Sequence, residues 1–277
     1  MTLPGSRTCA TTLLAVWLTG CVSTEQKSKT ADYEFITAHI IYGSLQSGID
    51  DLFYLGTVQT GKLADAAGRG DTHKMQQLVG EGAIVDGVGA YGMTPLLWSI
   101  NKRNLDGFKW LLEHNANPNL VSCCDAKQLD SNPMEIAAAL SNSEYLELLL
   151  SHGGDVNLRS GPQQQTPLFA AIAYHRTENI KLLIRNHADV NAAEVNSPIV
   201  GGYAHTPLSD AMGVGQYEIA ILLLQAGADA CAKDALGHSV AYEMSTHANI
   251  GVTDADRKVY PQIVERLKPL ACSKNGP

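Results

Sequence analysis

The sequence lacks several features that would point to a common class of protein. Aromatic residues make up only 6% of the chain, and 20 Lys and Arg against 28 Asp and Glu leave a formal net charge of −8. That sign excludes a general nucleic-acid binder, because such a protein needs a basic face to neutralise phosphates. No apolar run reaches the roughly 18–20 residues that span a bilayer, which excludes a polytopic membrane protein. Hydrophobic residues still form 45% of the 277 positions, enough for a substantial core in one elongated domain or two ordinary ones.

Catalytic and metal-binding signatures are missing as well. The chain has no Gly-x-Ser-x-Gly elbow, no His-Glu-x-x-His and no phosphate-binding glycine loop. Its six cysteines form no Cys-x-x-Cys pair and its nine histidines are scattered, so the spacing of a zinc site is absent. The sequence therefore predicts a protein that is not an enzyme, with no catalytic residues, no metal, no cofactor and no small-molecule substrate.

The first twenty-one residues have the pattern of an export signal. Arg7 precedes an apolar stretch, residues 9–18, that is too short to anchor the chain by itself. The stretch ends in Leu18-Thr19-Gly20-Cys21, which resembles the lipobox of bacterial lipoproteins. The resemblance implies a signal peptide over residues 1–20 and acylation of Cys21, and several acyl chains anchor a protein firmly. Val22 in place of an aspartate implies sorting to the outer membrane, on its periplasmic side.

Two further segments separate this signal from the body of the chain. Residues 21–32 are polar after the cysteine and are expected to form a short lipidated tether. Residues 33–60 are expected to hold an N-terminal cap that covers the end of the following domain; a separate binding element is the alternative.

The rest of the chain repeats itself with a period near 33 residues. Thr-Pro-Leu recurs at 94–96, 166–168 and 206–208, and Asn132-Pro133-Met134 is a degenerate copy. In all four copies, 25 residues separate the opening Thr or Asn from the end of a turn such as Gly153-Gly154-Asp155-Val156-Asn157. A weaker copy begins at Gly61, and a sixth begins near Ser239.

This pattern resembles the ankyrin repeat, whose hallmark is Thr-Pro-Leu-His followed by a leucine-rich helix and a Gly-Ala-Asp turn. The resemblance implies an all-α solenoid of stacked helix-turn-helix repeats with hairpin fingers. The threonine caps the first helix and the proline occupies its first position. Small residues on that helix allow close approach, and leucines on the second helix fill the core between neighbours. The expected repeat domain covers 61–272 in about six units: 61–93, 94–131, 132–165, 166–205, 206–238 and 239–272.

The period is interrupted twice. Successive starts differ by 33, 38, 34, 40 and 33 residues, so extra residues fall in the loops 120–131 and 192–205. Lengthened fingers could reach a partner, and neutral insertion is the alternative because loops tolerate added length cheaply.

In ankyrin proteins the fingers and the first helices form a concave recognition surface, and tyrosines on such a surface are good anchors. Carried over to this chain, the resemblance implies partner-binding positions at Tyr91, Met93, Asn101, Lys102, Gln128, Leu129, Ser131, Gln163, Gln165, Tyr174, His175, Tyr203, His205, Val214 and His238.

Four cysteines remain beyond the lipid site. An oxidising periplasm permits disulfides, but residues two or more repeats apart are out of bonding reach. The favoured pair is Cys231–Cys272, which would tie down the C-terminal cap. Cys123 and Cys124 would then form a vicinal disulfide or stay free thiols.

Three functional hypotheses follow. The first is a membrane-tethered, periplasmic protein-binding module, in one version an immunity protein that blocks an interbacterial, phospholipase-like toxin of type VI secretion. The second is an envelope scaffold or stress-protection factor, and the third is a hydrolase on a repeat frame. The sequence does not identify the partner.

Overall fold

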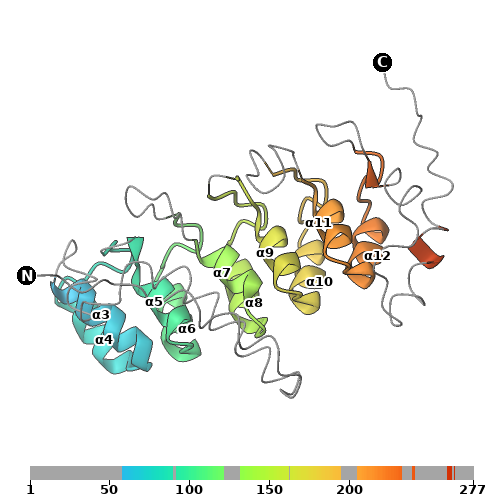
Figure 1. Ribbon diagram of the computed structural model, residues 1–277. Coiled ribbons are helices and arrows are strands. Elements are labelled where there is room, and N and C mark those ends of the chain that lie inside the picture. The colour runs from blue at the N-terminus through green and yellow to red at the C-terminus, as the bar shows by residue number, and fades with distance from the viewer. Residues whose placement is uncertain are drawn as a thin grey trace, which may run out of the picture.

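The computed structural model describes residues 58–89, 92–121, 132–161, 163–194, 205–232, 239–240, 261–263 and 265. Paired helices dominate this part of the chain (Figure 1). The pairs are α3 (Val58–Arg69) with α4 (Thr72–Gly80), α5 (Pro95–Asn101) with α6 (Leu105–Glu113), α7 (Pro133–Ala139) with α8 (Glu144–Ser151), α9 (Pro167–Ala173) with α10 (Thr177–Arg185), and α11 (Pro207–Gly213) with α12 (Tyr217–Gln225). The predicted signal peptide, the tether and nearly all of the predicted N-terminal cap lie outside the described residues.

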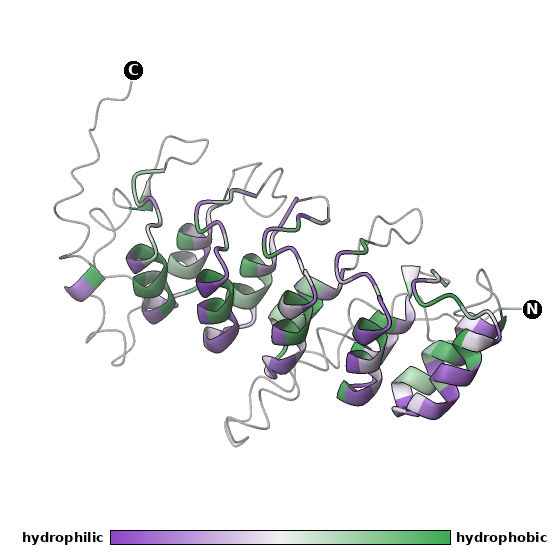
Figure 2. Ribbon diagram, turned by 180° about the vertical axis from the view of Figure 1, so that it is seen from behind, coloured by the Kyte–Doolittle hydropathy of each residue, from purple (hydrophilic) through white to green (hydrophobic). Residues whose placement is uncertain are grey.

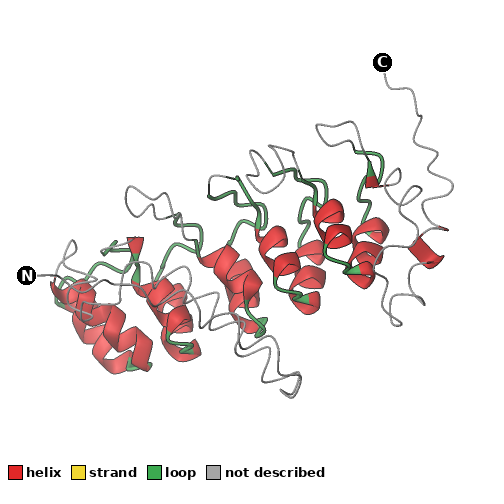
Figure 3. Cartoon of the chain, viewed as in Figure 1, coloured by secondary structure: helices red, strands yellow, loops and turns green. Residues whose placement is uncertain are grey.

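The pairs stack side by side into two layers of helices. The first helices of the pairs form the inner layer, in which α3 contacts α5, α7 contacts α9, and α9 contacts α11. The second helices form the outer layer. The loops that connect one pair to the next lie at one common end of the stack (Figure 3). In the described part these loops contain one isolated pairing, between Ser160 and Gln165 at the base of a finger. The fold is thus the all-α array of paired helices that the sequence predicted.

Most inner helices begin as the motif predicts. The side chains of Thr94, Asn132 and Thr206 accept hydrogen bonds from the backbone N–H three residues on, and proline follows each of them. Thr166 has the same backbone conformation but makes no capping bond with its side chain. A hydrogen-bonded cap satisfies one of the free N–H groups of the first turn.

The first described helix reaches into the segment predicted as the N-terminal cap. Helix α3 covers residues 58–60 together with the start of the first predicted repeat. Gly61-Lys62 stands where the other copies have a capping residue and a proline, so no start signal fixes the helix at that point. Thr60 is buried in this extra turn and its hydroxyl accepts the backbone N–H of Ile84, 3.2 Å away, which ties the helix to its own finger.

The core lies between the two layers and between successive repeats. The predicted small side chains of the inner helices are buried, including Ala66, Ala67, Ser99, Ala137, Ala138, Ala171 and Ala211. The outer helices of the second to fifth repeats each carry a pair of bulky residues, of which the second, Leu111, Leu149, Leu183 or Leu223, is fully buried. The first of the pair is only partly buried in three of the four repeats, as Leu148, Leu182 and Leu222 are. Figure 2 shows hydrophobic residues where the helices face one another and hydrophilic residues on their outward sides.

The last described residues continue this core beyond the fifth repeat. Val240 and Ile263 are buried in the same cluster as Leu223 and Ala230. Residues 261–263 and 265 are helical and fall inside the sixth predicted unit, 239–272. Among the described residues, no helix is long and apolar enough to cross a membrane.

Candidate functional site

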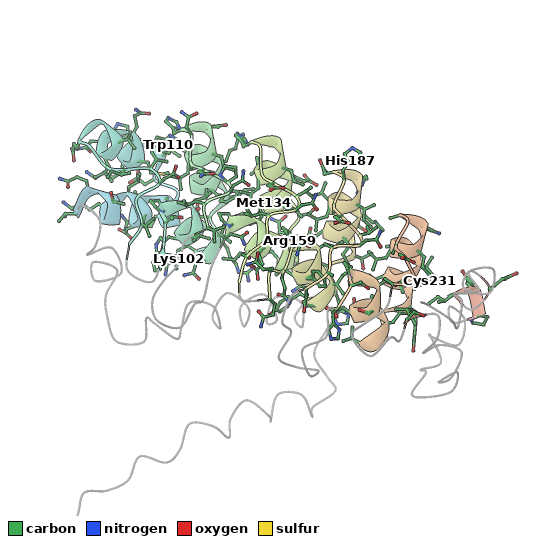
Figure 4. All side chains as sticks on the ribbon, turned by 90° about the horizontal axis from the view of Figure 1, so that it is seen from above. Lys102, Trp110, Met134, Arg159, His187 and Cys231 are labelled. Carbon is green, nitrogen blue, oxygen red and sulfur yellow. The ribbon has the colours of Figure 1, made fainter. Side chains whose placement is uncertain are left out.

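Six of the seven residues are buried in each of the inner helices α5, α7 and α9, so the accessible side chains on this side of the array lie at the helix ends. Seen from above, Lys102 lies on the inner-helix side, whereas Trp110 lies on the opposite, outer-helix side (Figure 4). Trp110 is packed in its own repeat, where its ring stacks on His114 with centroids 3.6 Å apart. Lys102, by contrast, is exposed directly after α5.

The structure corrects one predicted contact, and six other predicted contacts lie outside the described residues. Met93 is only 5% exposed and belongs to the core, because it precedes the buried cap Thr94 and packs inward with it. It is therefore not a residue that a partner can reach. The predicted positions outside the described residues are Tyr91, Gln128, Leu129, Tyr203 and His238, together with Ser131, Cys21 and Cys272.

The remaining predicted positions are accessible in different degrees. Lys102 and His175 are exposed, and Val214 is 61% exposed. Half-buried side chains occupy the others, which are Asn101, Gln163, Gln165, Tyr174 and His205.

Lys102 lies on a buried aromatic ring. Its Nζ is 4.6 Å from the centroid of Trp98, a cation–π contact. Gly68 of α3 makes room for this pair, since a Cβ there would lie 2.9 Å from both Trp98 Nε1 and Lys102 Cγ. The Lys102 side chain is thus held in place between the first and second repeats, with its ammonium group exposed to solvent.

His175 is held in an unusual backbone conformation at the end of α9. Its φ of 57° is in the left-handed region, and its Nε2 lies 3.3 Å from Nε2 of Gln216 in the next repeat. Burial, and secondarily the nearby Arg176 charge, lowers the pKa of His175, which favours the neutral ring. Gln216 also donates to the carbonyl of Ile172, 2.9 Å away, so the histidine is positioned across a repeat interface.

A polar cluster that the sequence did not reveal lies at the base of the longest finger. We call Gln165, Glu194, His205 and Asp210 the finger-base cluster. Glu194 is 4% exposed and accepts a hydrogen bond from Gln165 Nε2. The Glu194 backbone N–H donates to the His205 carbonyl at 2.8 Å, and His205 Nδ1 lies 3.1 Å from Asp210 Oδ1. Of the four, only Gln165 and His205 were predicted, because nothing near Glu194 or Asp210 in the sequence marks a carboxylate that will be buried.

A related set lies one finger earlier. Ser160 occupies the place of Glu194 and its hydroxyl donates to Glu135 Oε2 at 2.6 Å, while accepting from Asn132 Nδ2 at 2.7 Å. Arg159 then joins this finger to the next, because its Nη1 donates to the carbonyls of Gln164 and Ala193 at 3.1 and 2.9 Å. These bonds position neighbouring finger bases relative to one another.

The finger-base cluster predicts a measurable pH dependence. Burial, and secondarily the Glu194 charge, raises the pKa of Asp210 from 3.8 to about 6, although His205 opposes the shift. The folded state therefore binds this proton more tightly than the unfolded chain, so the cluster becomes more favourable as the pH falls from about 6 towards 4. We expect Asp210→Asn to raise the unfolding free energy at pH 7 by about 1 kcal/mol and to lose that advantage near pH 4.

Urea unfolding of the two proteins between pH 4 and 7.5 measures this difference. Asp106→Asn, at an exposed carboxylate on α6, is the matched control. A difference between Asp210→Asn and the unaltered protein that stays constant across this pH range would contradict the prediction.

The cysteine and histidine positions give no metal centre in the described part of the chain. No group of three or more His, Cys, Asp and Glu side chains is placed there to hold a metal ion. His114 and His152 each place Nδ1 2.8 Å from the carbonyl four residues earlier, which closes the end of an outer helix. Cys231 is disulfide-bonded. The predicted pairing with Cys272 stays a prediction.

The paired helices, fingers and repeated caps define an ankyrin-repeat array. Residues 134–234 match the family model of ankyrin repeats in three copies, and residues 91–123 match that of a single ankyrin repeat. Ankyrin repeats form protein–protein interaction modules and are typically not catalytic.

Comparison with curated proteins gives distant relatives that share the repeats. The chain is 32% identical to Protein PhlB of Serratia liquefaciens over 133 residues, which cover 48% of this chain and 56% of that protein. It is 27% identical to human Ankyrin repeat and SOCS box protein 16 over 218 residues, covering 66% of this chain and 47% of that protein. The chain thus spans about half the length of these relatives.

Proposed function

We propose that this protein is a lipid-anchored, periplasmic binding module that holds a protein partner on the inner-helix face. The observation that carries the proposal is a contrast between equivalent positions of successive repeats. The residue directly after the inner helix is Lys102, Tyr174 or Val214 in the second, fourth and fifth repeats, three chemically different side chains that are exposed or half-buried, whereas the third repeat has the buried Leu140 there. The core positions of these repeats are apolar side chains throughout, such as Ile100, Phe169 and Leu208. A constant frame with a varied exposed row is what a recognition surface on a solenoid requires.

The charges of this face favour a partner that carries both acidic and basic groups. Lys102 supplies a cation at one end of the inner helices, while carboxylates of the finger-base cluster and Glu135 lie near the other end. Partly exposed Asp210 and His205 offer hydrogen-bonding groups at the edge of the long finger. A protein surface with an acidic group opposite Lys102, and apolar and basic groups along the rest of the face, would match these features, because complementary charges select and orient partners.

The anchor and the compartment are the second part of the proposal. Acylation of Cys21 would fix the array near a membrane surface, and the short tether would keep it there. The disulfide at Cys231 supports an oxidising compartment such as the periplasm, since disulfides are rare in reducing compartments. In its most specific form, the partner is an interbacterial toxin and the module is its immunity protein, which obstructs the toxin's active-site cleft.

The partner-binding claim is tested with paired variants of the full, tagged chain. Lys102→Glu combined with Val214→Asp should lower recovery of a stoichiometric envelope partner about tenfold or more. The first substitution reverses the charge at its contact, and the second places an unpaired charge at an apolar contact. Lys109→Ala combined with Glu113→Ala changes only an exposed ion pair on outer helix α6 and is the matched control. Quantitative affinity purification from solubilised envelopes measures both. Equal recovery by the two double variants would overturn this assignment of the binding face.

The same preparations test the anchor and the specific role. A fatty-acid label should be incorporated by the unaltered chain and be absent from Cys21→Ser; a label that persists in this variant contradicts the anchor. If the recovered partner is a toxin, its expression should kill cells that lack this chain and should not kill cells that also express it. A partner that is harmless when expressed alone would favour the envelope scaffold or stress-protection role.

A further inference from the structure

A row of asparagine side chains joins the turns of successive repeats. Asn119, Asn157 and Asn191 occupy the same position of the second, third and fourth repeats. Their Nδ2 groups donate to carbonyls of the next repeat, at 2.9, 3.4 and 3.2 Å, and their Oδ1 atoms accept N–H groups of Asp155, Asp189 and Asp229 at 2.6, 2.8 and 2.7 Å. Each amide therefore uses a donor and an acceptor to cross one interface, and we call these contacts the asparagine bridges.

The first repeat contains half of such a bridge. Asp86 stands at the equivalent position, and its Oδ1 accepts the backbone N–H of Asn117 at 2.9 Å. A carboxylate accepts but does not donate, so only the acceptor half of the contact is present. The side chain at this one position thus joins each repeat to its successor across four consecutive interfaces.

The fifth repeat has Cys231 at this position. Its backbone N–H still donates to Asp229 Oδ1 at 2.8 Å, as Asn157 and Asn191 do to Asp155 and Asp189 at 2.9 Å. The turn is therefore the same, but the side chain has no amide to form a bridge. Cys231 is instead disulfide-bonded. Beyond it, buried Val240 and Ile263 continue the core, so a further unit must be held against the fifth repeat.

We propose that the disulfide of Cys231 replaces the asparagine bridge at this last interface. The packing of the C-terminal unit, the part of the chain that follows the fifth repeat, then depends on the redox state of Cys231. A dithiol reductant would supply two electrons and two protons, becoming a disulfide itself, while the protein's S–S bond breaks to give two thiols. The Cys231 thiol is a weak donor and a weak acceptor and does not reproduce the bonds of an amide. Reduction therefore loosens the last interface and leaves the asparagine bridges intact.

The consequence is a local, rather than global, change in stability. In a stack whose repeats contact only their neighbours, loss of one interface releases the units beyond it. A closed disulfide removes freedom from the open state, so reduction should raise the opening of the C-terminal unit about tenfold or more. Hydrogen exchange of backbone amides reports such openings segment by segment.

The experiment compares the full chain with and without dithiothreitol by hydrogen exchange and mass spectrometry. Reduction should accelerate exchange in 219–232 and 261–265 about tenfold or more, and leave 133–158 unchanged. Cys231→Asn restores an amide and should remain protected in both conditions, whereas Cys231→Ser should be open in both. No acceleration on reduction, or equal opening of the Asn and Ser variants, would overturn the proposal.

Two controls separate the proposed device from unrelated effects. Cys123→Ser combined with Cys124→Ser removes two other cysteines of the repeat domain and should retain the response to reduction; loss of the response would assign it to those residues. Asn157→Ala removes one asparagine bridge and should accelerate exchange around 155–157 and 187–189 regardless of reductant. Unchanged exchange there would mean that the bridges do not hold the interfaces, which also overturns the proposal.

Discussion

Gly107→Ala should destabilise the array by about 3 kcal/mol or more, although Gly107 lies inside a helix. A helix-interior alanine is ordinarily more favourable than glycine by about 1 kcal/mol, so helix propensity alone predicts the opposite sign. Gly107 of α6 meets the backbone of α3: a Cβ there would lie 2.0 Å from the Ala67 carbonyl oxygen and 2.7 Å from its carbon. Backbone atoms have no rotamer with which to move aside, so the first and second repeats must separate.

Gly80→Ala is the matched control for this variant. Gly80 is the last residue of α4 and a Cβ there would meet no atom within 4 Å, so we expect a neutral to slightly stabilising change. Urea unfolding followed by tryptophan fluorescence measures both, because Trp98 and Trp110 lie in the second repeat, beside the altered contact. If Gly107→Ala proved as stable as Gly80→Ala, the close approach of α6 to α3 would be wrong.

Asn179→Ala is expected to cost about 2–3 kcal/mol. The side chain of Asn179 is 1% exposed, and its Nδ2 lies 3.2, 2.9 and 2.8 Å from the carbonyl oxygens of Ala137, Ala138 and Leu140. These carbonyls end α7, which continues into an extended Leu140 rather than a left-handed residue. Alanine would leave them buried without this donor, and unpaired buried carbonyls are costly.

Asn186→Ala tests whether the effect depends on burial. Asn186 follows the same outer helix, α10, and its Nδ2 donates to the Leu182 carbonyl at 2.8 Å, but it is exposed, so water can replace it. We expect a loss below about 1 kcal/mol, measured by the same urea titration. Equal losses from the two asparagine variants would refute the capping role of Asn179.

Gly107 and Asn179 are the same position of two different repeats. This position, near the start of the outer helix in the repeat register, is occupied by Gly107, Tyr145, Asn179 and Ile219 in the second to fifth repeats. In the second repeat the absence of a side chain lets the helices touch, and in the fourth a long amide caps the helix end that it meets. The contact between an outer helix and the inner helix of the preceding repeat is therefore made by close backbone approach in one repeat and by side-chain hydrogen bonds in another.

The predicted binding face was only partly recoverable from the sequence. Lys102 and His175 are accessible as predicted, because the repeat register places them at the end of an inner helix. Met93 was wrong, since register alone does not tell which side of the chain faces the core just before the cap. Glu194 and Asp210 were missed, because their proximity depends on the path of the long finger between them.

The sequence by itself determined the repeat, the helix pairs and most of the helix starts. These features rest on local signals, a capping residue, a proline and the spacing of leucines, that recur in each copy and act within a few residues. Only the tertiary structure decided how each interface is filled: by Gly107 against Ala67, by Asn179 across 39 to 42 residues, or by the asparagine bridges. Such contacts join residues of neighbouring repeats, and their chemistry depends on how closely two backbones approach, which no single repeat encodes.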